Sequence, residues 1–392
     1  MSQFGNLQAR MTEITRRLTS ESAGKSTQVI RDALAAAGLT PAAALPRTGQ
    51  AEAPHNFVAD MLARFGIGAA APAPHADTVD ATPGGGKFVA GSYANAAGSR
   101  RYKVYIPSGY DGRPVPLVVM LHGCTQDPDD FARGTQMNAL AEEQGFLVVY
   151  PAQESSANSS KCWNWFKAMD QQRGQGEPSL IAGITNEVID QYGLDRKQVF
   201  VAGLSAGGAM AIIMGSTYPD LYQAVGVHSG LPYASASDLT SALGAMRGTS
   251  GTSGTSVTSP SSARRGGASA KLEAIPVIVF HGDRDTTVSP SNGTGLIDDF
   301  VARFEQTAAS GEKISTVVEE GKTGTGHRYS RTSLHVDGRP VLAEHWLIHG
   351  AGHAWAGGNA SGSYTDASGP DASREMLRFF STQSADSESL QN

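Results

Sequence analysis

The sequence predicts an α/β fold with a mostly parallel central sheet and helices on both of its faces. Short apolar runs rich in β-branched residues, each bounded by turn residues, indicate strands. These runs are almost continuously apolar, which is typical of parallel strands that are covered on both faces. Helical patterns at 130–144, 180–191 and 208–216 alternate with them and predict right-handed crossovers. The expected strands are Tyr102–Ile106, Pro116–Leu121, Phe146–Tyr150, Val199–Ala202, Ala224–Val227 and Pro276–Phe280, followed by a hairpin of Arg328–Val336 and Pro340–Ile348 around Asp337-Gly338.

Segments outside this alternation differ from it in composition. Leu7, Met11, Ile14 and Leu18 recur at helical spacing, so a helical segment is expected at the N-terminus. A stretch rich in Ala, Pro and Gly follows and predicts a flexible linker. The expected organisation is a helical segment over 1–39, a linker over 40–87 with a short helix near 57–65, an α/β domain over 88–380 with a mobile low-complexity insertion at 248–268, and a flexible tail over 381–392.

Charge and composition narrow the classes of function. The 31 basic and 37 acidic residues give a formal charge of −6, and basic residues do not cluster, so we expect no nucleic-acid partner. No apolar run reaches the roughly 18–20 residues of a transmembrane helix. The first ten residues lack the basic-then-apolar pattern of a secretion signal, which predicts a cytoplasmic protein.

The two cysteines, Cys124 and Cys162, are too few for a structural zinc site, and the sequence predicts neither a metal nor another cofactor. If they form one disulfide, an oxidising compartment and a secreted protein become the alternative.

One motif points to nucleophilic catalysis. Gly203-Leu204-Ser205-Ala206-Gly207 lies between an expected strand and an expected helix, the context in which G-x-S-x-G forms a nucleophile elbow. Glycines two residues before and after the serine permit the tight turn. The alternative is a glycine-rich turn that only packs closely. The motif predicts Ser205 as a catalytic nucleophile.

A serine hydroxyl needs a base, and the base needs an acid, which in α/β-hydrolases follow the serine in the order acid, then histidine. Asp283 and Asp285 come directly after the strand 276–280, and we favour Asp285 as the acid, with Asp283 capping the loop or pairing with Arg284. His353 lies in a glycine-rich loop after a strand and is the favoured base. The histidines considered are His281, His327, His335, His345, His349 and His353.

The remaining site residues are expected in two loops. The backbone N–H groups of Ala206 and Cys124 are candidates for an oxyanion hole, since Cys124 follows the strand 116–121. Aromatic residues near these positions indicate an apolar substrate cleft, with core packing as the alternative. They are Trp163 and Trp165 in one segment and Trp355 beside His353.

Five motifs together resemble the polyhydroxybutyrate depolymerase family of esterases over about residues 88–380. They are His122–Gln126, Cys162–Trp165, Gly203–Gly207, His281–Val288 and Gly352–Gly358. The resemblance implies an α/β-hydrolase fold and ester hydrolysis through an acyl-enzyme. It further implies a triad of Ser205, Asp285 and His353, with Cys124 in the oxyanion loop.

The leading hypothesis is thus a serine esterase that acts on short-chain hydroxyalkanoate polyesters or oligomers. Because the same branch also resembles feruloyl and acetylxylan esterases, a carbohydrate esterase is the alternative. A hypothesis of another class is a protein that binds a granule or membrane surface through the apolar stripe of residues 5–39. The alternative for that stripe is a helix packed on the α/β domain.

Overall fold

The structure, a computed structural model, describes residues 85–248, 273–308, 312–324 and 326–389. The chain divides into two units, Met1–His55 and Asn56–Asn392, and every described residue belongs to the second. The expectations for the segment 1–39, for the linker up to residue 84 and for residues 249–268 of the insertion lie outside the described residues.

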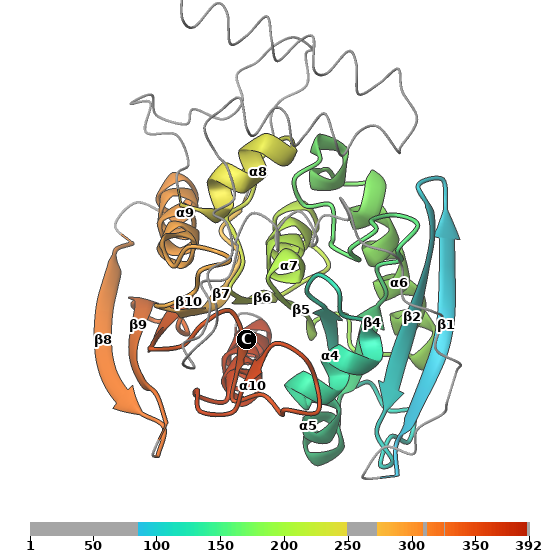
Figure 1. Ribbon diagram of the computed structural model, residues 1–392. Coiled ribbons are helices and arrows are strands. Elements are labelled where there is room, and N and C mark those ends of the chain that lie inside the picture. Colours follow the sequence, from blue (N-terminus) through green and yellow to red (C-terminus); the bar gives the residue numbers. More distant parts are fainter. Residues whose placement is uncertain (1–84, 249–272, 309–311, 325, 390–392) are drawn as a thin grey trace, which may run out of the picture. The chain divides into compact units, whose positions relative to one another are not determined.

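The second unit contains a ten-stranded sheet in the order β1-β2-β4-β3-β5-β6-β7-β10-β9-β8 (Figure 1). Neighbouring strands from β4 to β10 run parallel, while the outer pairs at both edges are antiparallel. The strands are β1 (Lys87–Asn95), β2 (Gly98–Ile106), β3 (Leu117–Leu121), β4 (Leu147–Pro151), β5 (Val199–Leu204), β6 (Ala224–His228), β7 (Val277–Gly282), β8 (Ile314–Lys322), β9 (Arg328–Val336) and β10 (Ala343–His349). A separate parallel pair joins β11 (Trp355–Ala356) to β12 (Thr365–Asp366).

Helices cover both faces of the sheet. Alternate residues of β3 show this, because Val119 packs in one apolar cluster with α6 and α7, and Met120 packs in the other with α4, α5 and α10. The predicted α/β fold with a mostly parallel sheet is confirmed. The helices are α4 (Pro128–Thr135), α5 (Met137–Gln144), the short 3₁₀ helix η1 (Ala168–Gln171), α6 (Gly176–Tyr192), α7 (Ala206–Thr217), α8 (Leu239–Met246), α9 (Ser291–Thr307) and α10 (Ala372–Ser389).

The structure differs from the sequence-based expectation at several places, and α8, α9, β11 and β12 were not among the expected elements. The single helix expected over 130–144 is two helices, because Gln136 takes a left-handed conformation (φ 56°) that ends α4 and begins α5. The strands β1 and β8 were not expected, since both are largely exposed and lack an apolar pattern. The tail expected over 381–392 is helical as far as Ser389, where it continues α10.

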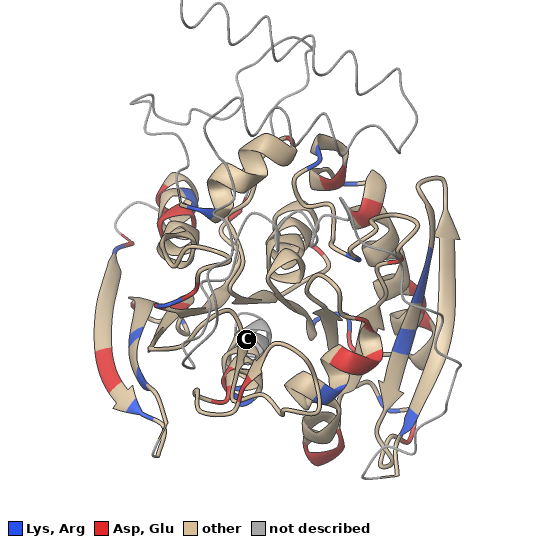
Figure 2. Cartoon of the chain, viewed as in Figure 1, with Lys and Arg blue, Asp and Glu red and all other residues tan. Residues whose placement is uncertain are grey.

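Charged residues of both signs are interspersed over the described elements (Figure 2). The cations of β2 illustrate this, because each has an acidic partner nearby. The pairs are Arg100 with Glu177, Arg101 with Glu154, and Lys103 with Asp129. Among the described helices, none combines the length and apolarity needed to cross a bilayer.

A disulfide joins Cys124, in the loop after β3, to Cys162, in the loop that follows β4. The two residues are 38 positions apart in the sequence. The bond therefore holds together two loops that leave neighbouring strands at the same edge of the sheet.

Replacing both cysteines, Cys124→Ala with Cys162→Ala, is expected to lower the free energy of unfolding by about 2–4 kcal/mol, because the cross-link restricts the unfolded chain. Urea denaturation measures this loss. Reduced wild-type protein should show a similar loss, and a double variant as stable as the oxidised wild type would contradict the expectation.

Candidate active site

Ser205 occupies a strained turn between β5 and α7. Its φ of 57° lies in the left-handed region, which side chains with a Cβ rarely adopt. The backbone N–H of Ser205 donates to the carbonyl of His228 at 2.9 Å, which holds the turn against β6. A Cβ on Gly207 would lie 2.0 Å from the carbonyl oxygen of Leu121, so a larger residue cannot replace this glycine without a backbone shift. This is the geometry expected of a nucleophile elbow.

One candidate oxyanion donor belongs to the residue after this serine, and the other belongs to the loop after β3. Ala206 is the first residue of α7, and the N–H groups of the first helical turn have no acceptor within their helix. Leu121 pairs with Gly203, so the loop after β3, which contains Cys124, leaves the sheet beside the serine turn. Three hydrogen bonds shape that loop: Gly123 N to Gln126 Oε1 (2.9 Å), Thr125 N to Ser160 O (2.7 Å) and His122 Nδ1 to Gly123 O (2.7 Å).

His353 and Asp285 meet at the carboxyl edge of the sheet. The loops that hold them follow β10 and β7, which are parallel neighbours paired at Ile348 and Gly282. His353 Nδ1 donates to Asp285 Oδ2 at 2.6 Å. The proton on Nδ1 leaves Nε2 as the acceptor, the atom that a serine general base uses.

The environment of Asp285 favours its ionised form. Burial alone would raise the pKa of this carboxyl, but hydrogen bonds from His281 and His353 outweigh it and hold the pKa well below its usual value. The second carboxylate oxygen accepts the backbone N–H groups of Thr287 and Val288 at 2.8 and 2.9 Å. The carboxylate is thus both charged and fixed in orientation.

The structure separates the two candidate acids. Asp283 accepts from the N–H of Gly350 at 2.7 Å and contacts Nδ1 of His349 at 3.1 Å. Its hydrogen-bond partners are therefore Gly350 and His349, and the nearby charge of Arg284 also helps to lower the pKa of its carboxyl. Of the two aspartates, Asp285 is the one that binds His353.

Two buried histidines behind the site were not assigned a role from the sequence. His281 donates from Nε2 to the carbonyl of Val288 at 2.9 Å, and the same nitrogen lies 3.5 Å from Asp285 Oδ2. His228 accepts the N–H of Ala356 at 3.0 Å, and burial lowers its pKa to about 3. The position of His281, four residues before Asp285, is the signal that could have indicated this contact. From the sequence, His281 was considered only as a candidate base.

The aromatic residues are buried and do not line an exposed cleft, contrary to the cleft interpretation. Trp163 and Trp355 are 0% and 1% exposed, and Trp165 is 5% exposed. The indole N–H of Trp163 donates to His122 O, and that of Trp355 donates to Ser373 Oγ, both at 3.1 Å. These side chains pack beneath the loops of the site, which agrees with the packing alternative.

A buried carboxylate organises the Trp163 segment. Glu177, 3% exposed, accepts the backbone N–H of Asn164 at 2.7 Å and its side-chain amide at 2.6 Å. Gln153 donates its side-chain amide to the same carboxylate, and its backbone N–H donates to His122 Nε2 at 3.0 Å. Polar contacts therefore connect α6 to the loop after β3.

A doubly covered, mostly parallel sheet with a strained serine between a strand and a helix at its carboxyl edge defines an α/β-hydrolase. The chain belongs to the Esterase PHB depolymerase family, whose model matches residues 100–321, more than half of the chain. The matched range contains Ser205 and Asp285 and ends before His353.

Several characterised proteins are similar to this chain. A poly(3-hydroxyalkanoate) depolymerase C from Paucimonas lemoignei is 34% identical over 64% of this chain and 57% of its own length. An acetylxylan esterase A from Talaromyces purpureogenus is 31% identical over 54% of this chain and 55% of its own length. This chain thus spans about half the length of these relatives. An acetyl xylan esterase structure from Aspergillus awamori shares the fold, with a TM-score of 0.51 and 21% identity over 72% of this chain and 94% of that one.

The neutral form of His122 leads to a prediction about pH. Nδ1 donates and Nε2 accepts, so a second proton would oppose the N–H of Gln153. Burial lowers the pKa of His122 from 6.5 to about 4. Between these pH values the unfolded chain binds more protons than the folded one, so this residue makes stability fall as the pH falls.

The variant His122→Gln is therefore expected to reduce the slope of the unfolding free energy against pH by up to about 1.4 kcal/mol per pH unit. Urea denaturation from pH 7 to 4 measures both slopes. Equal slopes in the variant and the wild type would contradict the expectation.

Proposed function

We propose that the chain is a serine carboxylester hydrolase with Ser205 as nucleophile, His353 as base and Asp285 as the residue that orients the base. The observation that carries the proposal is the 2.6 Å hydrogen bond between His353 Nδ1 and Asp285, at the sheet edge where Ser205 occupies a strained turn. Membership in the Esterase PHB depolymerase family supports the same chemistry.

In the proposed reaction, His353 Nε2 takes the proton of the Ser205 hydroxyl as its oxygen attacks the ester carbonyl carbon. The tetrahedral intermediate collapses, and the alcohol leaves with the proton from His353. Water then attacks the acyl-enzyme with His353 as base again, which releases the acid and restores Ser205. Asp285 stays ionised and stabilises the imidazolium in both steps, and its lowered pKa supports this role.

The negative charge on the intermediate needs preorganised donors. The N–H of Ala206, at the positive end of α7, and the N–H of Cys124 are the proposed pair. Loss of one such donor typically costs about 2.7–4 kcal/mol of transition-state stabilisation.

The proposed substrate is a short-chain hydroxyalkanoate polyester or its oligomers. The name and similarity of the Paucimonas lemoignei depolymerase support it. Acetyl or feruloyl esters of polysaccharides are the second candidate, because an acetylxylan esterase A and a feruloyl esterase B from Thermothelomyces thermophilus are 31% and 32% identical to this chain over shorter segments.

We also propose an oxidising compartment as the place of action. The disulfide between Cys124 and Cys162 supports this alternative over the cytoplasm, where thiols are kept reduced.

The roles of the two aspartates are tested with matched substitutions. Asp285→Asn is expected to lower kcat on p-nitrophenyl butyrate by about 10⁴-fold, because the amide cannot hold His353 in the correct tautomer. Asp283→Asn, which changes an aspartate bound to His349, should leave kcat within a few fold. Ser205→Ala should abolish hydrolysis while keeping the wild-type circular dichroism spectrum. Equal losses in the two aspartate variants, or activity in Ser205→Ala, would disprove the assignment.

A substrate panel separates the two ester classes. The wild type is expected to release 3-hydroxybutyrate from amorphous polyhydroxybutyrate or its soluble oligomers faster than ferulate or acetate from xylan. Chromatographic product analysis measures all three acids, with Ser205→Ala as the blank. Faster release of ferulate or acetate would favour the carbohydrate esterase.

A further inference from the structure

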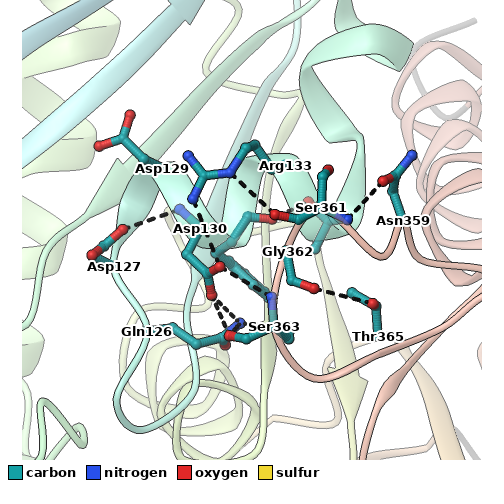
Figure 3. A network of polar contacts seen from close by, with 12 residues as sticks. Gln126, Asp127, Asp129, Asp130, Arg133, Asn359, Ser361, Gly362, Ser363 and Thr365 are labelled. Carbon is teal, nitrogen blue, oxygen red and sulfur yellow. Dashed lines mark hydrogen bonds and ion pairs between the residues drawn. The ribbon is translucent and has the colours of Figure 1, made fainter. Parts of the chain in front are cut away.

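The loop between β11 and β12, residues 357–364, lies directly on α4. A Cβ on Gly362 would be 2.4 Å from both the N and Cα atoms of Gly134, so the two backbones touch. The N–H of Asn359 donates to the carbonyl of Gly134 at 2.8 Å, and the carbonyl of Ser361 accepts from Arg133 at 3.3 Å (Figure 3). This loop begins four residues after His353, the proposed base.

One buried amide connects the 357–364 loop to the loop after β3. Gln126 is 2% exposed, and its Oε1 accepts the N–H of Gly123, the residue before the proposed donor Cys124. Its Nε2 donates at 3.1 Å to the carbonyl of Ser363, 237 positions away in the sequence. The side chain therefore binds the oxyanion loop with one end and the 357–364 loop with the other.

A carboxylate on α4 completes this contact. Asp130 Oδ1 accepts the N–H of Ser363 at 3.0 Å, and Oδ2 accepts the Ser363 hydroxyl and, at 3.0 Å, Gln126 Nε2 (Figure 3). The N–H, the carbonyl and the hydroxyl of Ser363 are thus each bound by Gln126 or Asp130. Replacing Gln126 by an apolar residue would leave the buried N–H of Gly123 without its acceptor, which is costly, and would also remove the amide that binds the Ser363 carbonyl.

The 357–364 loop is in turn connected to the proposed base. The carbonyl of Tyr364 accepts the N–H of Trp355 at 2.7 Å, two residues after His353. The hydroxyl of Tyr364 lies 3.3 Å from that of Thr125, the residue after Cys124. A continuous set of contacts therefore leads from the oxyanion loop, through Gln126 and Ser363, to the segment that holds His353.

We propose that Gln126 is a positioning residue that sets the oxyanion loop and the loop of His353 at a fixed distance from each other. The proposal rests on the proposed function, since both loops must face one tetrahedral intermediate. Gln126 does not touch the reacting atoms. It acts by fixing the position of the Cys124 N–H relative to the His353 imidazole. A misplacement of catalytic groups by about 1 Å costs about 100-fold in rate.

The experiment compares the isosteric variant Gln126→Met with Gln198→Met. Gln198 donates its amide to the Asp195 carboxylate at 2.8 Å, which is the same chemistry, but it precedes β5 at the opposite edge of the sheet. Gln126→Met is expected to lower kcat on p-nitrophenyl butyrate by about 10–100-fold. KM should stay within about twofold, because ground-state binding does not use the oxyanion donors. Gln198→Met should leave both constants unchanged.

A second variant separates the two ends of the side chain. Gln126→Glu keeps an oxygen for the Gly123 N–H but replaces the donor to Ser363 and Asp130 by a carboxylate, which repels both. It is expected to lower kcat in the same direction as Gln126→Met. Because it preserves the Gly123 contact, it also tests the proposal if Gln126→Met fails to fold.

Amide hydrogen exchange provides a measurement that does not depend on activity. Exchange in residues 357–364 should rise in both Gln126 variants and not in Gln198→Met. Unchanged exchange there, or a folded Gln126 variant with wild-type kcat, would overturn the proposal. A wild-type chain that hydrolyses no ester would overturn the proposed function instead. The exchange measurement would then still show whether Gln126 couples the two loops.

Discussion

The close backbone approach between α7 and the end of β3 is the constraint on which the candidate site depends. A Cβ on Gly207 would lie 2.0 Å from the carbonyl oxygen of Leu121, so only glycine permits the approach. Since Leu121 also pairs with Gly203, the serine turn and the loop after β3 form one packed unit. The proposed nucleophile and the proposed oxyanion donors therefore lie beside each other for reasons of backbone packing, before any hydrogen bond of the site is considered.

Neutral buried imidazoles connect segments near the site that are not paired with each other in the sheet. An imidazole with one proton offers one donor and one acceptor in fixed directions. His122 uses both, toward Gly123 O and the N–H of Gln153, and so joins the loops after β3 and β4. His228 accepts the N–H of Ala356. Burial holds the pKa values of both rings well below neutrality, and this keeps the acceptor nitrogens available.

Much of the fold could be predicted, and the principal residues of the candidate site could be proposed, because their signals are local. A strand, G-x-S-x-G and a helix follow one another in the chain, so the position of Ser205 required no knowledge of distant contacts. Other features depend on contacts that spacing does not encode. Nothing near Asp283 in the sequence indicates that its side chain binds His349. Likewise, a large aromatic residue such as Trp163 near the site motifs is compatible with a substrate cleft or with the core. Only the three-dimensional packing shows that it lies in the core.

Three of the described non-glycine residues with positive φ belong to the loops of the candidate site, and hydrogen bonds restrain them. Thr125, Ser205 and Tyr364 all have positive φ values, which cost conformational energy in residues with a Cβ. Each is restrained by a backbone bond of 2.7–2.9 Å: Thr125 N to Ser160 O, Ser205 N to His228 O, and Trp355 N to Tyr364 O. The three residues lie on separate loops, and the hydroxyls of Thr125 and Tyr364 lie 3.3 Å apart. Because the bonds anchor each loop to a different neighbour, the strain is retained in the folded state and the loops keep the geometry that the proposed chemistry requires.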